Sequence, residues 1–224
     1  MHVKLVSLTQ PLVEGLSSPE DLIVYCARVS NPKNQLNTAT GSKLLKYCID
    51  HGHWSIFEQV DMTVEIQTNI PISAQILRHK SASFQQFSAR YSKVQEFEPI
   101  ELRRQAENNR QSSTDIFDPI VPNHVIGNES QSKLSALIDQ HFEYSKYLYE
   151  LCIEHNVAKE CARFLLPQAA QTTMYMKNNI RNWIHYIELR TKEDTQKEHR
   201  LIAEQIKQIF IEQFPIISEA LNWE

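Results

Sequence analysis

The order of apolar and polar positions along the chain predicts strands at residues 3–8, 57–70 and 172–177. The apolar positions that alternate within 57–70 are Val60, Met62, Val64 and Ile66. Such alternation is typical of a strand with one buried face. Pro71 follows directly, and because the first turn of a helix tolerates proline, we expect a helix to begin there.

Apolar residues spaced three and four positions apart predict further helices. These helices cover residues 19–28, 42–51, 133–156, 157–166, 179–189 and 193–214. In the helix that Pro71 opens, the spacing of Gln75, Arg78 and His79 places the three side chains on one face. That face is a candidate for binding chemistry.

Residues 103–130 are polar and contain prolines, asparagines and a glycine, so we expect a long loop there. Loops of this length are usually functional lids or disordered segments. No internal repeat or linker divides the sequence, and 224 residues can bury one substantial core. We therefore predict a single domain over residues 1–224.

The composition, with 42% hydrophobic and 22% charged residues, is that of a soluble globular protein. The four cysteines are widely spaced, which argues against a disulfide framework and a zinc ribbon. The N-terminal residues lack the layout of a signal peptide, and no apolar run reaches membrane-spanning length. These features predict a cytoplasmic enzyme or binding protein without a membrane partner.

Positive charge is gathered in two segments of a chain whose net charge is −4. Residues 66–95 and 161–187 contain no Asp or Glu. Their basic residues are Arg78, Lys80, Arg90, Lys93, Arg163, Lys177 and Arg181. Local positive charge in an acidic protein is what an anion-binding site needs. Apolar residues at helical spacing in the same segments weaken the alternative, a pair of solvated basic faces.

The two common glycine-rich phosphate loops are absent from the sequence. The chain has only four glycines and contains neither GxGxxG nor GxxxxGK[ST]. A bound nucleotide would therefore be held by side chains and helix ends.

Four blocks of sequence resemble the flavin-dependent thymidylate synthases. The string Arg78-His79-Lys80, with Ser88 and Arg90-Tyr91 downstream, is similar to the family signature Arg-His-Arg, seven residues, Ser, one residue, Arg. The other blocks are His51-Gly52-His53 with Phe57-Glu58, Ala162-Arg163-Phe164-Leu165-Leu166-Pro167, and the segment from Asn179 through Arg181 and His185 to Leu189-Arg190. The blocks occur in family order and cover the chain from about His51 to Arg190.

The resemblance implies a fold, a reaction and an assembly. The fold would be α/β (α+β), with a mostly antiparallel central sheet packed against helices, like that of a thymidylate synthase-complementing protein. The reaction would be a methyltransferase reaction, the reductive methylation of dUMP to dTMP. Methylenetetrahydrofolate would donate the carbon, and FAD reduced by NADPH would carry the hydride. The assembly would be a homotetramer with active sites shared between subunits.

The resemblance also implies roles for individual residues. The FAD-binding residues would be Ser55, Arg78, His79, Lys80, Gln86, Asn179, Ile180, Arg181 and His185. The dUMP-binding residues would be Gln75, Arg78, Gln86, Ser88, Ala89, Arg90, Arg163 and Arg190. Arg190 would be the catalytic residue.

These residue types suit the implied chemistry. Guanidinium groups bind phosphate oxygens through two parallel hydrogen bonds, and both FAD and dUMP carry phosphates. An arginine beside the pyrimidine can stabilise negative charge that develops on its amide, which is the role implied for Arg190. Flavin would supply the hydride, and the protein the orientation.

The chain departs from the family pattern at three positions. Lys80 replaces the usual third arginine, which keeps the charge but loses the planar fork. Gln85 replaces a common Asn, a mild change. Gln86 replaces a frequent Glu and removes a negative charge near both ligands. This last change leaves open a related flavoenzyme that makes a different 5-substituted pyrimidine nucleotide.

Other interpretations are weaker. Ser88 lacks an evident adjacent base, so phosphate binding is favoured over nucleophilic attack. His51-x-His53 and Cys152-x-x-His155 do not complete a ligand set, so no metal site is predicted. A non-enzymatic nucleotide- or RNA-binding module would require a steep salt dependence. The net negative charge and the lack of an RNA-binding signature argue against a stable nucleic-acid partner.

One geometric question concerns the predicted helix 179–189. Arg181 and His185 share a face of an uninterrupted helix, whereas Arg190 falls nearly opposite Arg181. Either the helix ends near Leu189, or its two faces serve different ligands or subunits.

Overall fold

The structure is a computed structural model that describes residues 1–94, 96–123 and 130–223. The chain divides into two compact units. Unit 1 comprises Met1–Gln67, Gln75–Gln86 and Thr173–Glu224, and unit 2 comprises Thr68–Ala74 and Phe87–Thr172. The assignment of residues 1–224 to one domain stays a prediction.

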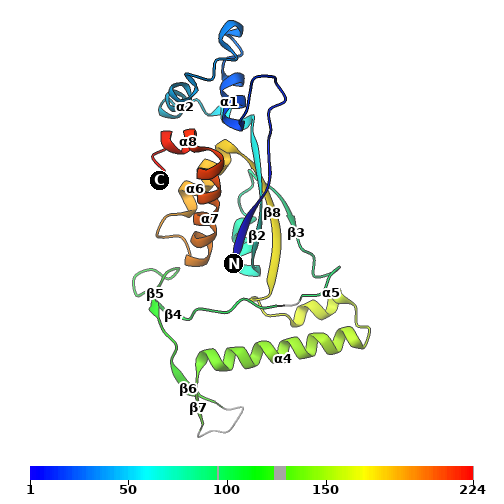
Figure 1. The fold of residues 1–224 in the computed structure, drawn as a ribbon. Helices are drawn as coiled ribbons and strands as arrows, with labels where there is room; N and C mark the ends of the chain where they lie inside the picture. Colours follow the sequence, from blue (N-terminus) through cyan, green and yellow to red (C-terminus); the bar gives the residue numbers. More distant parts are fainter. Residues whose placement is uncertain (95, 124–129, 224) are drawn as a thin grey trace. The chain divides into compact units, whose positions relative to one another are not determined.

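A four-stranded sheet with the strand order β1-β2-β8-β3 runs through unit 1 (Figure 1). Its strands are β1 (His2–Leu8), β2 (Asp61–Asn69), β8 (Gln171–Asn179) and β3 (Ser83–Gln86). β1 pairs antiparallel with β2, and β3 pairs antiparallel with β8. The expected fold class, helices packed on a mostly antiparallel sheet, is confirmed.

Side-chain alternation explains why β2 forms a strand. Met62, Val64 and Ile66 are fully buried, as the period of two predicts. Glu65 lies opposite Lys4 of β1, and their side chains form an ion pair of 3.0 Å. The Lys4 ammonium lowers the pKa of Glu65, so the carboxylate stays charged at the sheet.

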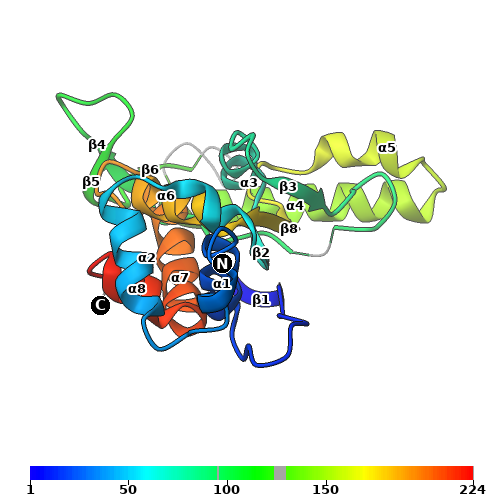
Figure 2. The ribbon, with the colours of Figure 1, turned by 90° about the horizontal axis from the view of Figure 1, so that it is seen from above.

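The helices of unit 1 are α1 (Pro19–Ala27), α2 (Gly41–Asp50), α6 (Ile180–Arg190), α7 (Lys197–Gln213) and α8 (Pro215–Ala220). α7 packs against β1 and α6, and α2 packs against α8 (Figure 2). Trp183 of α6 is fully buried, and its indole Nε1 donates to the Met62 carbonyl of β2 at 2.9 Å. The prediction that Trp183, Tyr186 and Ile187 belong to the core is confirmed.

Unit 2 contains the long helix α4 (Leu134–Glu154), the short helix α5 (Lys159–Ala162) that follows it, and a 3-10 turn, η3 (Arg163–Leu165). Two small hairpins precede α4: β4 (Arg103–Gln105) pairs with β5 (Ser113–Ile116), and β6 (Ile120–Pro122) with β7 (Gln131–Lys133). The prediction of a long loop over 103–130 is therefore wrong for the described residues, because short strands there pair with each other. Residues 124–129 lie outside the description.

Other predicted boundaries need correction. The predicted strand 57–70 begins only at Asp61, because Trp54–Glu58 forms the 3-10 turn η2. A further 3-10 turn, η1, covers Pro32–Asn34. The strand β3 and the helix α8 were not predicted.

The helix α3 (Ile70–Ile76) ends before Arg78 and His79, although both residues were predicted to lie on it. Beyond Ile76, the Arg78 N–H bonds to the Gln75 carbonyl at 3.2 Å, and the His79 N–H bonds to the Ile76 carbonyl at 3.1 Å. These i→i−3 bonds tighten the chain into turns. The prediction that Gln75, Arg78 and His79 share one helical face is wrong, since only Gln75 lies on the helix.

No helix among the described residues is long and apolar enough to cross a membrane.

Candidate active site

A half-buried guanidinium lies at the C-terminal end of α6 in unit 1. Arg190 Nε donates a hydrogen bond of 2.9 Å to Nε2 of His79, which lies in the turn after α3. The two residues are 111 positions apart in the chain. The fold thus joins the signature segment to the last of the four sequence blocks.

The His79 imidazole is held in its neutral form. Burial, with smaller contributions from Arg190 and His185, lowers its pKa to about 4. A neutral ring can accept a hydrogen bond at Nε2, whereas a protonated ring could only donate. His79 therefore accepts from Arg190 and fixes one edge of the guanidinium, whose remaining N–H groups can serve a ligand.

Gln75 bonds to the start of α7 within unit 1. Its Oε1 lies 3.2 Å from Nδ1 of His199, and its Nε2 donates to Oε1 of Gln196 at 2.6 Å. The expected dUMP ligand Gln75 is therefore held by two side chains that no sequence motif identified.

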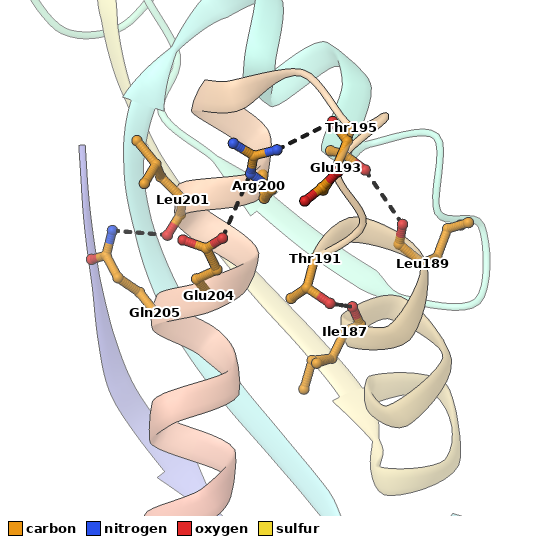
Figure 3. Close-up of polar contacts among 9 residues, drawn as sticks. All are labelled: Ile187, Leu189, Thr191, Glu193, Thr195, Arg200, Leu201, Glu204 and Gln205. Carbon is orange, nitrogen blue, oxygen red and sulfur yellow. Dashed lines mark hydrogen bonds and ion pairs between the residues drawn. The ribbon is translucent and has the colours of Figure 1, made fainter. Parts of the chain in front are cut away.

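The segment that joins α6 to α7 is pinned by side-chain bonds to backbone carbonyls (Figure 3). The Thr191 hydroxyl donates to the Ile187 carbonyl at 2.8 Å, and the Arg200 guanidinium donates to the Glu193 carbonyl at 3.1 Å. These bonds hold the end of α6, which carries Arg190, at a defined position relative to the start of α7.

The two faces of α6 do carry different groups. The helix ends at Arg190, one residue beyond Leu189, which agrees with the expectation of an end near Leu189. On another face, Arg181 and His185 line a pocket of 390 Å³. The other residues lining this pocket are Trp54, Asn182, Ile184 and Glu188. The shared face of Arg181 and His185 is confirmed. That the two faces of α6 serve different ligands or subunits stays a prediction.

Arg181 also meets a carboxylate. Its Nη1 lies 2.5 Å from Oε1 of Glu58, and both side chains are partly exposed. Lys177 is similarly paired with Asp61 at 2.8 Å. The segment that lacks acids in the sequence is therefore not free of carboxylates in space, because acids from residues 58–61 approach it.

The remaining predicted FAD ligands of unit 1 lie on several different elements of the fold. Asn179 is the N-cap of α6, and its side chain accepts the Asn182 N–H at 3.0 Å. Ile180 is fully buried, and its backbone N–H bonds to the Val60 carbonyl. The other four are the exposed Arg78 and Lys80, the exposed Ser55 of η2, and the half-buried Gln86 at the end of β3.

A second pocket, of 490 Å³, lies in unit 2. Its lining residues are Ser88, Arg90, Tyr91, Ala158, Lys159 and Glu160. The chain turns tightly here, since the Tyr91 and Ser92 N–H groups both bond to the Ser88 carbonyl at 3.0 Å. Lys159 Nζ donates to the Tyr91 carbonyl at 3.0 Å, which ties this turn to α5.

Charge in the unit 2 pocket is exposed. Arg90 Nη2 lies 3.7 Å from Oε2 of Glu160, and more than half of each side chain is accessible to solvent. Ala89 lies in the same turn, half-buried. Arg163 begins η3 and lies over the Phe164 ring, 5.5 Å from its centroid. The fold thus brings Ser88, Arg90 and the N-terminal end of α5 together.

Sequence reasoning missed several residues at these sites. Trp54 and Glu188 line the first pocket, and Lys159 and Glu160 line the second. His199 was missed as well, although its position three residues before the buried Ile202 places a polar ring on the apolar stripe of α7. That position was the available signal.

Among residues 1–94, 96–123 and 130–223, no group of three or more His, Cys, Asp or Glu side chains could hold a metal ion. His51 instead stacks on Tyr47 with ring centroids 3.9 Å apart, and its Nδ1 lies 2.8 Å from the Tyr47 carbonyl.

Known proteins resemble this chain over its whole length. A probable flavin-dependent thymidylate synthase of Paramecium bursaria Chlorella virus 1 is 49% identical over 224 residues, all of both chains. A flavin-dependent thymidylate synthase of Synechocystis sp. is 47% identical over 226 residues, again all of both chains. A solved structure of the UMP/dUMP methylase PolB from Streptomyces cacaoi, bound with 5-Br dUMP, has the same fold. Its TM-score is 0.77 at 24% identity, over 99% of this chain and 94% of that one.

The family model described as thymidylate synthase complementing protein matches residues 11–216. This range includes Arg190, His79 and both pockets. With these full-length relatives and this match, the chain belongs to the thymidylate synthase complementing protein family.

Proposed function

We propose that this protein is a flavin-dependent thymidylate synthase that converts dUMP to dTMP. The observation that supports this most directly is the Arg190–His79 hydrogen bond of 2.9 Å, which joins two sequence blocks of the family at one half-buried cation. Relatives with that name share nearly half of all residues over the full length. Methylenetetrahydrofolate would donate the methylene carbon, and NADPH would supply the reducing equivalents.

The first pocket suits an anionic aromatic cofactor such as FAD. Trp54 offers an aromatic ring, and Arg181 and His185 offer donors for phosphate oxygens. Glu58 engages one of the five N–H donors of Arg181, so others remain for a ligand. Bound FAD, once reduced by NADPH, would supply the hydride.

The protein's own residues then have defined tasks. Arg190 would stabilise negative charge as it develops on the uracil amide, with neutral His79 orienting its guanidinium. Arg78 and Gln75 would contact the nucleotide in unit 1. Ser88, Arg90 and Arg163 of unit 2 would bind phosphate, since the exposed donors of Ser88 and Arg90 line a pocket and suit a multiply charged anion.

Assembly and location complete the proposal. The protein would be a homotetramer with active sites shared between subunits, and light scattering of the purified protein would measure its mass. Large apolar side chains that lie exposed in unit 2, such as Tyr91 and Phe164, support an assembly that covers them.

All four cysteines are free thiols, which supports a cytoplasmic location.

A spectroscopic and kinetic assay tests the proposed function. The purified protein should bind FAD, with absorbance in the visible range, and should oxidise NADPH faster when dUMP is present. Failure to bind added FAD would contradict the proposal. A product other than dTMP would instead favour a related flavoenzyme, the alternative that Gln86 leaves open.

A further inference from the structure

A half-buried lysine of unit 2 belongs to none of the four sequence blocks. Lys159, the first residue of α5, lines the second pocket, and its Nζ donates to the Tyr91 carbonyl at 3.0 Å. The two residues are 68 positions apart in the chain. The bond therefore ties the segment that contains Ser88 and Arg90 to the start of α5, to which no motif gives a role.

The turn that Lys159 holds carries two of the expected phosphate ligands. The Tyr91 and Ser92 N–H groups both bond to the Ser88 carbonyl, so Arg90 is a central residue of a tight turn over residues 88–92. Residues 87–94 lie outside every helix and strand that the structure describes. The 88–92 turn thus has a defined local shape, but regular secondary structure does not fix its place in unit 2. Side chains must do so.

Three contacts join this segment to the helices of unit 2, and the lysine makes the strongest of them. The Arg90–Glu160 pair, at 3.7 Å, joins two largely exposed side chains, so solvent screens it. The Val94 N–H bonds to the Tyr149 hydroxyl at 3.4 Å, which is longer than a typical hydrogen bond. The bond from Lys159, at 3.0 Å, has a charged donor and reaches the backbone of the turn itself.

A turn that is held in place before a ligand arrives binds that ligand more tightly. Fixing a mobile backbone costs conformational entropy, and a ligand that must order the turn bears this cost. Because Tyr91 directly follows Arg90, a bond to the Tyr91 carbonyl restricts the backbone from which the Arg90 side chain extends. The same restriction applies to Ser88, whose carbonyl accepts the two N–H groups that close the turn.

We propose that Lys159 is a positioning residue that holds the 88–92 turn in the shape that binds the phosphate group of the nucleotide. Lys159 acts through Ser88 and Arg90, whose side chains line the same pocket and contact the phosphate. The inference rests on the proposed function, since it takes this pocket of unit 2 as the phosphate site. It adds to that site a residue that the sequence motifs do not assign.

A double-mutant cycle on the affinity for dUMP tests the proposal. Dissociation constants are measured by calorimetry on the flavin-loaded full-length protein, for the wild type, Lys159→Met, Arg90→Ala and the double variant. Methionine keeps an unbranched side chain but has no N–H to donate. Lys159→Met alone should weaken dUMP binding about fivefold, the size expected for one lost hydrogen bond. In the Arg90→Ala background it should weaken binding at most about twofold, because the turn then has no guanidinium to position.

Two further variants separate positioning from a general effect of charge or stability. Lys159→Arg keeps both the charge and a donor for the Tyr91 carbonyl, so its dUMP affinity should lie within about twofold of the wild type. Lys93→Met is the matched control, since it removes an exposed cation of the same segment that lines neither pocket. Its affinity should equal that of the wild type. Circular dichroism checks that each variant is folded.

The outcomes distinguish this proposal from the proposed function. Wild-type protein that does not bind dUMP contradicts both. If the wild type binds dUMP and forms dTMP, the proposed function stands, and two results would still overturn the positioning role. One is an unchanged affinity in folded Lys159→Met. The other is an equal loss in both backgrounds, which would mean that Lys159 acts on the phosphate independently of Arg90. A loss that depends on Arg90 and is restored by Lys159→Arg supports the positioning role.

Discussion

The two units hold their basic side chains in different ways. In unit 1, Arg190 is half-buried and bonded to the neutral ring of His79, which lies against a buried network of Tyr186 and His199. In unit 2, Arg90 lies in an exposed turn and meets Glu160 at 3.7 Å, and solvent screens the pair because more than half of each side chain is exposed. We infer that unit 1 supplies orientation and transition-state stabilisation, whereas unit 2 supplies attraction for an anion.

The largest effect, a loss of turnover, is expected from Arg190→Ala. Removal of a preorganised charge that acts on the transition state should lower the turnover number about 10²–10³-fold. Flavin retention should be unchanged, because Arg181 and His185 lie on another face of α6. Turnover is measured at saturating dUMP. Lys43→Ala on α2 is the control, since it removes an exposed cation of unit 1 that lines neither pocket, and near-normal turnover is expected.

Burial of charge in unit 1 should also appear in the pH dependence of stability. Glu20 of α1 is 3% exposed and accepts the Ile217 N–H at 2.8 Å. Burial raises its pKa to about 7 from 4.5, despite the opposing effect of the bonds from Ile217 and Ile216. A raised pKa means that the stabilisation is complete below pH 4.5 and is lost as the pH rises through 7.

Glu20→Gln cannot ionise and keeps an acceptor for the Ile217 N–H. Relative to wild type, the variant should gain stability between pH 5 and pH 8 by on the order of 1–3 kcal/mol. Denaturant unfolding at several pH values measures this difference. Glu219→Gln, at an exposed position of the neighbouring α8, is the control. If the free energy of unfolding were equal for both variants and independent of pH, Glu20 would not be effectively buried.

In unit 2, Arg90→Ala should weaken binding without affecting chemistry. Loss of a charge-assisted contact to phosphate should raise the KM for dUMP about tenfold, with kcat nearly constant. The effect should shrink at high salt, because the site is exposed. Lys93→Ala removes an equally exposed cation of the same segment, outside the pocket, and serves as the control. A drop in kcat for Arg90→Ala would contradict the division of roles between the units.

The smallest effect is expected from Glu160→Gln. The variant releases Arg90 from its exposed partner, so dUMP should bind up to about threefold more tightly. The free energy of unfolding should stay within about 0.5 kcal/mol of the wild-type value. Weaker dUMP binding would indicate that Glu160 orients Arg90 instead of competing for it.

The sequence predicted the elements whose side-chain period is strong. The alternation in residues 57–70 identified β2, and Pro71 identified the start of α3 to within one residue. The hairpins of residues 103–133 were missed, because strands of three or four residues are too short to carry a clear periodic signal. The face shared by Arg181 and His185 followed from helix geometry alone.

Long-range partners could not be predicted. Glu58 lies 123 residues before Arg181, and nothing local to either indicates their ion pair. The absence of acids from a segment therefore did not describe its surroundings in space. His199 was visible only as a polar residue on an apolar stripe, and its bonds to Tyr186 and Gln75 depend on tertiary packing.

The most direct measurement is the mass of the nucleotide formed from isotopically labelled dUMP with methylenetetrahydrofolate, NADPH and FAD. The wild-type protein should yield labelled dTMP, and Arg190→Ala, with its flavin still bound, should yield at least a hundredfold less. Unchanged dUMP in the wild-type reaction, or equal dTMP from both proteins, would contradict a catalytic arginine held by His79 in a thymidylate synthase.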